Sequence, residues 1–165
     1  MEISEQIARI RAEGAALAAS AEAGPLDAVV PSCPGWDVEV LLRHIGDVHR
    51  WAATIVGERV PTRLRRDFVG PHGRHELFAW YREGCDALIA ALEAASPDES
   101  FWFWGPAPSA LAFWARRQAN ETAVHRSHAE PAHGPLPPLP TAGAPEAHPP
   151  NPAPARPTPG PPRRP

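Results

Sequence analysis

The chain has 165 residues, of which 23 are proline, two are cysteine and none is lysine. Fifteen of the prolines lie between residues 131 and 165, and that segment contains no Ile, Val, Phe, Trp or Tyr. Because it cannot bury enough apolar surface to offset the entropy of ordering it, we predict a folded domain over 1–130 and a disordered proline-rich tail over 131–165. The predicted domain contains 13 arginines and 18 acidic residues, and this negative balance argues against a nucleic-acid-binding surface.

The N-terminus and the cysteines indicate where the protein resides. The first residues are acidic where a signal peptide is basic, and no apolar run approaches the roughly 18 residues of a membrane span. Two cysteines make no disulfide framework. We therefore expect a cytoplasmic protein with no membrane partner.

Four segments have the apolar periodicity of a helix, and none alternates like a strand. Asp37 stands where the second helix needs an N-cap, and Ser109 does the same for the fourth. The predicted helices span about 3–21, 38–56 and 74–95, and the fourth follows its cap at Ser109 and runs to about residue 130. Four helices of similar length with one apolar stripe each predict an all-α fold, an up-down four-helix bundle.

Chargeable side chains fall on the apolar stripes of two of these helices. At about 100° per residue, His44 lies inside the stripe of the second helix, whereas His49 lies about 140° away, at its edge. Glu121 and His125, four residues apart in the fourth helix, share one face with the apolar residues. Together with His44 they would offer three ligands to one metal ion, the pattern of an open zinc site. The alternative is an ion pair or a histidine satisfied by the glutamate.

Several other residues have a structural and a functional interpretation. Arg117 lies about 40° around the helix from Glu121, so we expect it to pair with Glu121 or to bind an anionic cofactor. Cys33 and Cys85 are interpreted as packing residues. The aromatic residues near the start of the fourth helix are expected to close one end of the bundle; they are Trp102, Trp104 and Trp114.

Three strings resemble the metal-binding N-terminal domain of the mycothiol-dependent maleylpyruvate isomerase family, a branch of the DinB-like bundles. They are VPSCPGWDVEVLLRHIGDVHRWA (30–52), FWFWGP (101–106) and AFWARRQANETAVHRSHAE (112–130). The resemblance implies that the metal ligands are His44, Glu121 and His125. Where relatives commonly read HRWDAE, this sequence has Ser127 and His128, so that an acidic residue is replaced by another potential ligand.

The resemblance also implies a function. In that family a divalent metal, usually zinc, is thought to bind the sulfur of mycothiol, the small thiol of actinobacteria, which then adds to an electrophilic substrate. Relatives usually continue past the fourth helix into a segment that helps form the substrate site, where this chain has the tail over 131–165. Two functions are therefore open: a mycothiol-dependent isomerase or thiol transferase, or a non-catalytic metal or small-molecule binding bundle, a truncated relative of that enzyme. No catalytic residue is assigned.

Overall fold

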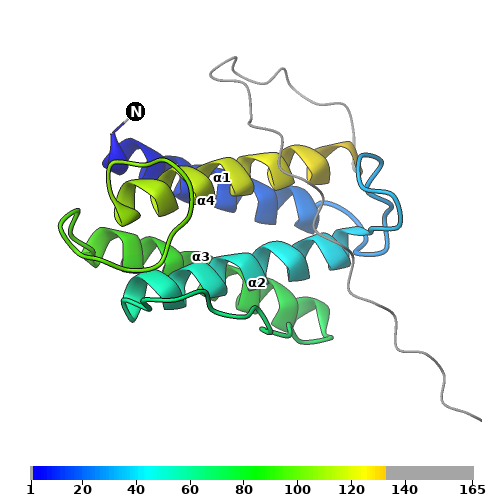
Figure 1. Cartoon of the computed structure of the whole chain (residues 1–165). Helices are drawn as coiled ribbons and strands as arrows, with labels where there is room; N and C mark the ends of the chain where they lie inside the picture. The colour runs from blue at the N-terminus through cyan, green and yellow to red at the C-terminus, as the bar shows by residue number, and fades with distance from the viewer. Residues whose placement is uncertain (1, 133–165) are drawn as a thin grey trace, which may run out of the picture.

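The computed structural model describes residues 2–132 as four long helices without a strand (Figure 1). The helices are α1 (Ile3–Glu22), α2 (Val38–Gly57), α3 (Arg74–Ala94) and α4 (Ala110–Ala129), followed by the single 3-10 turn η1 (Glu130–Ala132). The all-α four-helix bundle is therefore confirmed. Of the predicted tail over 131–165, residues 133–165 lie outside the described range.

Local signals in the sequence set where the helices begin. The Asp37 side chain accepts a hydrogen bond from the Val40 amide, and the Ser109 hydroxyl accepts one from the Ala112 amide. Each satisfies one of the amides that a helix start leaves without an intrahelical partner. The helices of the structure begin and end within one or two residues of the predicted bounds.

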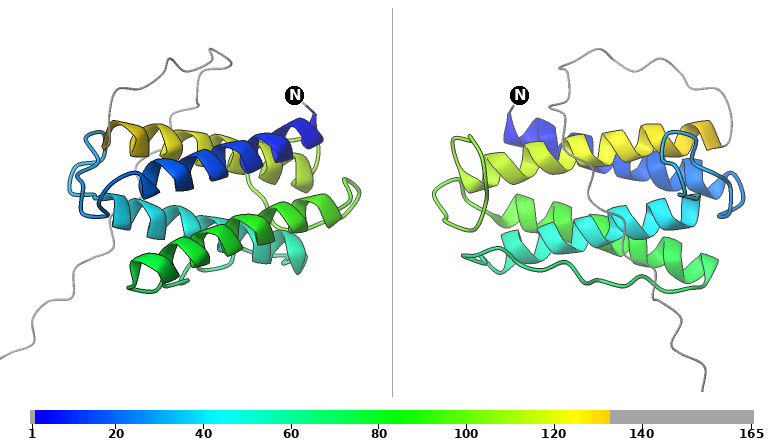
Figure 2. Two further views of the ribbon diagram at one scale, coloured as in Figure 1. Left: turned by 180° about the vertical axis from the view of Figure 1, so that it is seen from behind. Right: turned by 45° about the vertical axis from the view of Figure 1, so that its right-hand side comes forward.

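The structure adds the direction and the neighbours of each helix. Arg9 contacts Asn120 and Glu13 contacts Arg126, so α1 runs parallel to α4. Gly46 faces Trp80 and Gly57 faces Ala91, so α2 runs parallel to α3. The order of directions is thus up, down, down, up, and not the strict alternation that the predicted up-down bundle implies, because residues 58–73 run back along the bundle before α3 begins (Figure 2). As a result, α2 packs against α3 and α4, while α1 packs against α3 and α4.

The apolar core is divided into two parts along the bundle. One cluster includes Trp51, Leu88 and Trp114, and the other includes Leu41, Leu77 and Tyr81. Polar side chains are also buried; they are Gln6, His49, Gln118, Thr122 and His125. Burying such groups costs free energy unless they are paired or bind a ligand, so a functional site is expected near some of them.

The connection before α2 is a pair of tight turns. The Cys33 amide donates to the Val30 carbonyl at 3.0 Å, and the Trp36 amide donates to the Cys33 carbonyl at 2.9 Å. In the second turn Pro34 is followed by Gly35, whose φ of +81° suits the third position of a type II turn and favours glycine there. These bonds fix the positions of Cys33 and Trp36 relative to the start of α2.

Candidate metal centre

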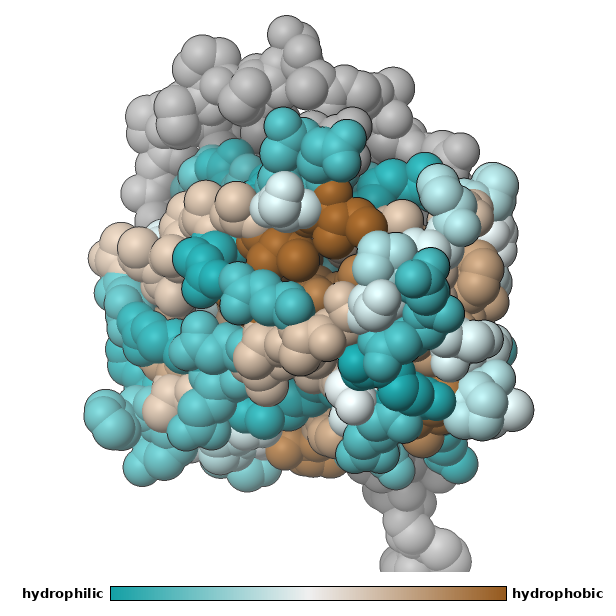
Figure 3. Space-filling model, turned by 90° about the vertical axis from the view of Figure 1, so that its left-hand side faces the viewer, coloured by the Kyte–Doolittle hydropathy of each residue, from teal (hydrophilic) through white to brown (hydrophobic). Residues whose placement is uncertain are grey.

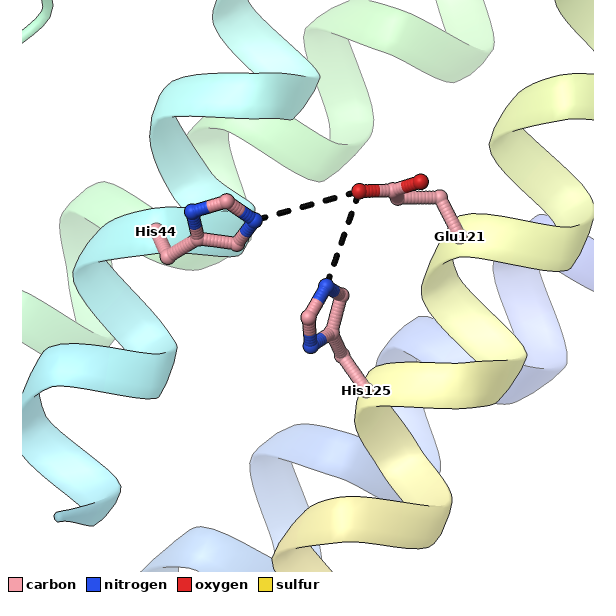
Figure 4. A group of neighbouring side chains, drawn as sticks. All are labelled: His44, Glu121 and His125. Atoms are coloured by element: carbon pink, nitrogen blue, oxygen red, sulfur yellow. Dashed lines mark ion pairs between the residues drawn. The ribbon is translucent and has the colours of Figure 1, made fainter. Parts of the chain in front are cut away.

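His44 of α2 lies opposite Glu121 and His125 of α4, and the three side chains converge (Figure 4). One ligand atom from each lies within 4.8 Å of those from the other two. The helix spacing of four residues stacks Glu121 and His125 on one face, as predicted from the sequence. We call these three residues the His–Glu–His cluster.

The spacing of the cluster suits a shared metal ion better than hydrogen bonds. Oε1 of Glu121 lies 3.8 Å from Nε2 of His44 and 3.5 Å from Nε2 of His125. A hydrogen bond from an imidazole to a carboxylate is shorter, about 2.7–3.2 Å. Two atoms that each bind one zinc ion at about 2.0–2.1 Å in tetrahedral geometry are roughly 3.3 Å apart. The donor set and its spacing therefore fit a divalent ion.

The electrostatics of the cluster keep the carboxylate ionised. Burial on its own would raise the pKa of Glu121. The imidazoles of His125 and His44 and the charge of Arg117 outweigh that effect and hold the pKa well below its usual range. An anionic carboxylate beside two imidazoles is a complete set of protein ligands for an open zinc site.

A comparison with protein-family models matches residues 7–130, about three quarters of the chain, to the mycothiol maleylpyruvate isomerase N-terminal domain. The chain belongs to this family. Comparisons with curated proteins and with solved structures gave no match. No helix within residues 2–132 combines the length and apolarity needed to cross a membrane.

In this mycothiol maleylpyruvate isomerase domain, Arg117 extends along one side of the cluster. Its guanidinium lies 3.4 Å from Oε2 of Glu121 and stacks on Trp104, with 4.9 Å between the guanidinium carbon and the ring centroid. Its Nε has no hydrogen-bond partner among the described residues. The predicted pairing with Glu121 is thus present, and Arg117 keeps unused hydrogen-bond donors.

Aromatic side chains close the end of the domain at which α4 begins. Trp51 packs edge-on against Trp114 with ring centroids 5.0 Å apart, and Trp102 and Trp104 pack beside them at 4.8 Å from each other. The indole N–H of Trp114 donates to the Trp102 carbonyl at 2.8 Å. Trp104 is 36% exposed, so this wall of aromatic rings reaches the surface next to Arg117.

The prediction for His49 was wrong, because this residue is fully buried rather than at the edge of the apolar stripe. The hydroxyl of Thr122 donates to the Gln118 carbonyl at 2.7 Å, so its oxygen accepts the N–H of His49 Nε2 at 2.9 Å. Burial lowers the pKa of His49 to about 3 and keeps the ring neutral. The ring of Tyr81 from α3 packs against the His49 ring, with centroids 5.8 Å apart. The buried face of α2 is therefore wider than the apolar stripe predicted from the sequence.

Of the other histidines among residues 2–132, His72 and His75 lie away from the cluster, whereas the His128 ring lies edge-on against His125 with centroids 5.5 Å apart. His72 is exposed beside Arg43, and His75 is exposed on α3. His128 lies one turn beyond His125, but its Nδ1 contacts Cys33 Sγ at 3.4 Å. Cys33 is therefore more than the packing residue that the sequence predicted, since its thiol meets an imidazole. Cys85 is buried in the core, as expected, and burial raises its pKa to about 12.

An apolar hollow lies away from the His–Glu–His cluster. It has a volume of about 430 Å³ and lies at the end of the bundle seen in Figure 3. Its walls come from α1, α3 and the start of α4, and include Ile3, Ile7, Leu92 and Leu111. None of the residues around it belongs to the His–Glu–His cluster.

Proposed function

We propose that the domain holds one divalent metal ion, zinc in the first instance, through His44, Glu121 and His125. We propose further that it serves a mycothiol-dependent enzyme of the maleylpyruvate isomerase type. The observation that carries the metal proposal is the convergence of three ligand atoms from two helices. Membership of the family supports the thiol and the class of reaction.

The chemistry of the donor set is consistent with a catalytic ion. Two neutral imidazoles and one carboxylate leave a divalent cation with positive charge and a free coordination position. When bound, such a cation supplies the charge that lowers the pKa of a thiol from roughly 8.5.

The surrounding side chains have separate tasks in this proposal. Trp36 lies 4.9 Å from the His44 ring and stacks on His125 with a centroid distance of 6.3 Å, so it excludes water from one side of the cluster. Arg117, with free donors and a neighbouring aromatic wall, binds an anionic group of the thiol cofactor or substrate. This assigns to Arg117 the cofactor-binding role that the sequence left as one of two alternatives.

Metal analysis of protein purified without a histidine tag tests the ligand set. We expect one ion per chain in the wild type and loss of it in His44→Ala, Glu121→Gln and His125→Ala. The matched control is His75→Ala, because His75 is exposed on α3 and outside the cluster. Retention of stoichiometric metal by folded Glu121→Gln, or loss in His75→Ala, would show that the ligands are assigned wrongly.

Cobalt substitution tests the thiol. Sulfur bound to tetrahedral cobalt gives an intense near-ultraviolet charge-transfer band that oxygen and nitrogen ligands lack. We expect this band when mycothiol is added to the cobalt-loaded wild type, with a weaker apparent affinity in Arg117→Ala. If fully metallated protein gives no band at saturating mycothiol, the thiol proposal fails. The alternative, a non-catalytic metal-binding bundle, is then preferred.

A further inference from the structure

A second arginine reaches the wall of aromatic rings beside Arg117. It is Arg66, from the segment over 58–73 that runs back along the bundle between α2 and α3 (Figure 2). Its guanidinium carbon lies over the Trp51 ring, 5.9 Å from the centroid. We propose that Arg66 and Arg117 together bind one carboxylate of the electrophilic substrate. This inference rests on the proposed function, because it concerns the same substrate beside the His–Glu–His cluster.

The two guanidinium groups stand over neighbouring rings of one wall. Arg117 stacks on Trp104 at 4.9 Å, and the centroid of Trp104 lies 6.1 Å from that of Trp51, the ring under Arg66. The two charges act on each other. Burial lowers the pKa of Arg117, the Glu121 carboxylate opposes that effect, and the charge of Arg66 lowers the pKa further. An anion bound by both groups would offset their repulsion.

Both arginines keep hydrogen-bond donors for a ligand. Nε of Arg66 lies 3.6 Å from Oδ2 of Asp47. A terminal nitrogen of Arg117 lies 3.4 Å from Oε2 of Glu121. Charge-assisted hydrogen bonds are shorter, about 2.7–2.9 Å, so these ion pairs hold the guanidinium groups in place without taking up their N–H donors. The side chains are 25% and 20% exposed, so a small molecule can reach both from solvent.

The charge of the site favours a ligand with one carboxylate here. Asp47 and Glu121 balance the two arginines, so the divalent ion of the proposed function leaves two positive charges unbalanced. The thiolate of the cofactor balances one of them, and one carboxylate of the substrate balances the other. The planar fork of a guanidinium matches a carboxylate in shape. The flat part of the ligand can then lie against Trp104, which is partly exposed.

The segment that carries Arg66 is fixed to α2 on both sides of this residue. The indole N–H of Trp51 donates to the Leu64 carbonyl at 2.9 Å, and the Phe68 amide donates to the Asp47 carboxylate at 3.3 Å. Anchored backbone therefore presents the Arg66 guanidinium to the wall. Such a group binds a ligand at a lower cost in entropy than a side chain on a loose loop.

Benzoate and its neutral isostere benzamide are the probes, with isothermal titration calorimetry of the zinc-loaded full chain as the readout. We expect benzoate to bind about tenfold more tightly than benzamide or better, and Arg66→Gln to weaken benzoate binding by about tenfold without affecting benzamide. The matched control is Arg65→Gln, which removes the same charge from the exposed neighbour and should change neither affinity. Equal affinities for the two probes, or equal effects of the two substitutions, would overturn the proposal.

Titration of the chelator-treated chain separates this inference from the metal proposal. The arginines and the aromatic wall are present without the ion, so we expect weaker benzoate binding that Arg66→Gln still reduces more than Arg65→Gln. If the wild type holds no zinc but shows this dependence, the metal proposal fails and the carboxylate site stands. If the chain holds zinc and Arg66→Gln weakens benzoate binding by less than about threefold, as at an exposed ion pair, the carboxylate site fails.

A second substitution keeps the test decisive if Arg66→Gln does not fold. Arg66→Lys retains the positive charge but loses the planar fork. If circular dichroism shows that Arg66→Gln is unfolded, Arg66→Lys replaces it, with Arg65→Lys as its control. We expect weaker benzoate binding in Arg66→Lys only, and equal binding by the two lysine variants would overturn the proposal.

Discussion

The contact between α2 and α3 depends on Gly46, which faces the indole ring of Trp80. A methyl group at Gly46 would lie 2.9 Å from Cε3 and from Cη2 of that ring, and closer still to Cζ3. Carbon atoms pack at about 3.5–4.0 Å, so the ring would have to move by more than about 1 Å to clear its nearest atom. It has little room, because the Arg50 guanidinium stacks on it and the backbone at Gly70 lies nearby.

We therefore expect Gly46→Ala to destabilise the domain. Overpacking costs about 1–3 kcal/mol, and a clash this close against a confined ring belongs to the upper part of that range, about 2–3 kcal/mol. Alanine in place of glycine within a helix returns up to about 1 kcal/mol. The expected net loss in the free energy of unfolding is about 1–2 kcal/mol, measured by urea denaturation of the metal-free chain and followed by circular dichroism.

The control for this substitution is Gly57→Ala in the same helix. A methyl group there would meet Cβ of Ala91 at 3.7 Å, which is an ordinary contact. We expect this variant to be as stable as the wild type or slightly more stable. If Gly46→Ala were equally stable, Trp80 would not be confined between α2 and its neighbours, and the reasoning about this contact would be refuted.

Three further predictions concern the polar interior and the metal. Thr122→Val removes the acceptor of the buried His49 N–H and should lower the free energy of unfolding by about 1–3 kcal/mol. Thr122→Ser keeps the hydroxyl and should retain most of the stability. If Thr122→Val were as stable as the wild type, the hydrogen bond would be contradicted. The pKa of His49 is about 3 in the folded chain and roughly 6.5 when unfolded, so the unfolded state gains a proton first and stability falls as pH drops from 6.5 towards 3. Urea titrations between pH 6 and 5 should show a slope smaller by up to about 1.4 kcal/mol per pH unit in His49→Gln than in the wild type, and identical slopes would refute this. Zinc at a hundredfold excess over its dissociation constant should add about 2.7 kcal/mol of stability in the wild type and none in Glu121→Gln, as read from thermal melts, and an equal gain in both would place the ion elsewhere.

The sequence by itself determined the features that depend on local interactions, namely where the helices begin and which residues share a helix face. The caps at Asp37 and Ser109 act on amides three residues away, so the starts of α2 and α4 are visible in a linear reading. Helical periodicity places Glu121 and His125 on one face for the same reason. The apolar stripe of α2 was sufficient to turn His44 inward. The three sequence segments that resemble the family contain His44, Glu121 and His125, and the match to the family model confirms the family.

Only the tertiary structure decided the features that depend on how distant segments pack. His49 is buried because α3 runs parallel to α2 and places Tyr81 against it, an arrangement set by the return of residues 58–73 along the bundle. Cys33 meets His128 because two consecutive turns bring the thiol against the last turn of α4. Periodicity within one helix holds no information about which helix covers its flank or which loop covers its end, since those contacts join residues far apart in the sequence.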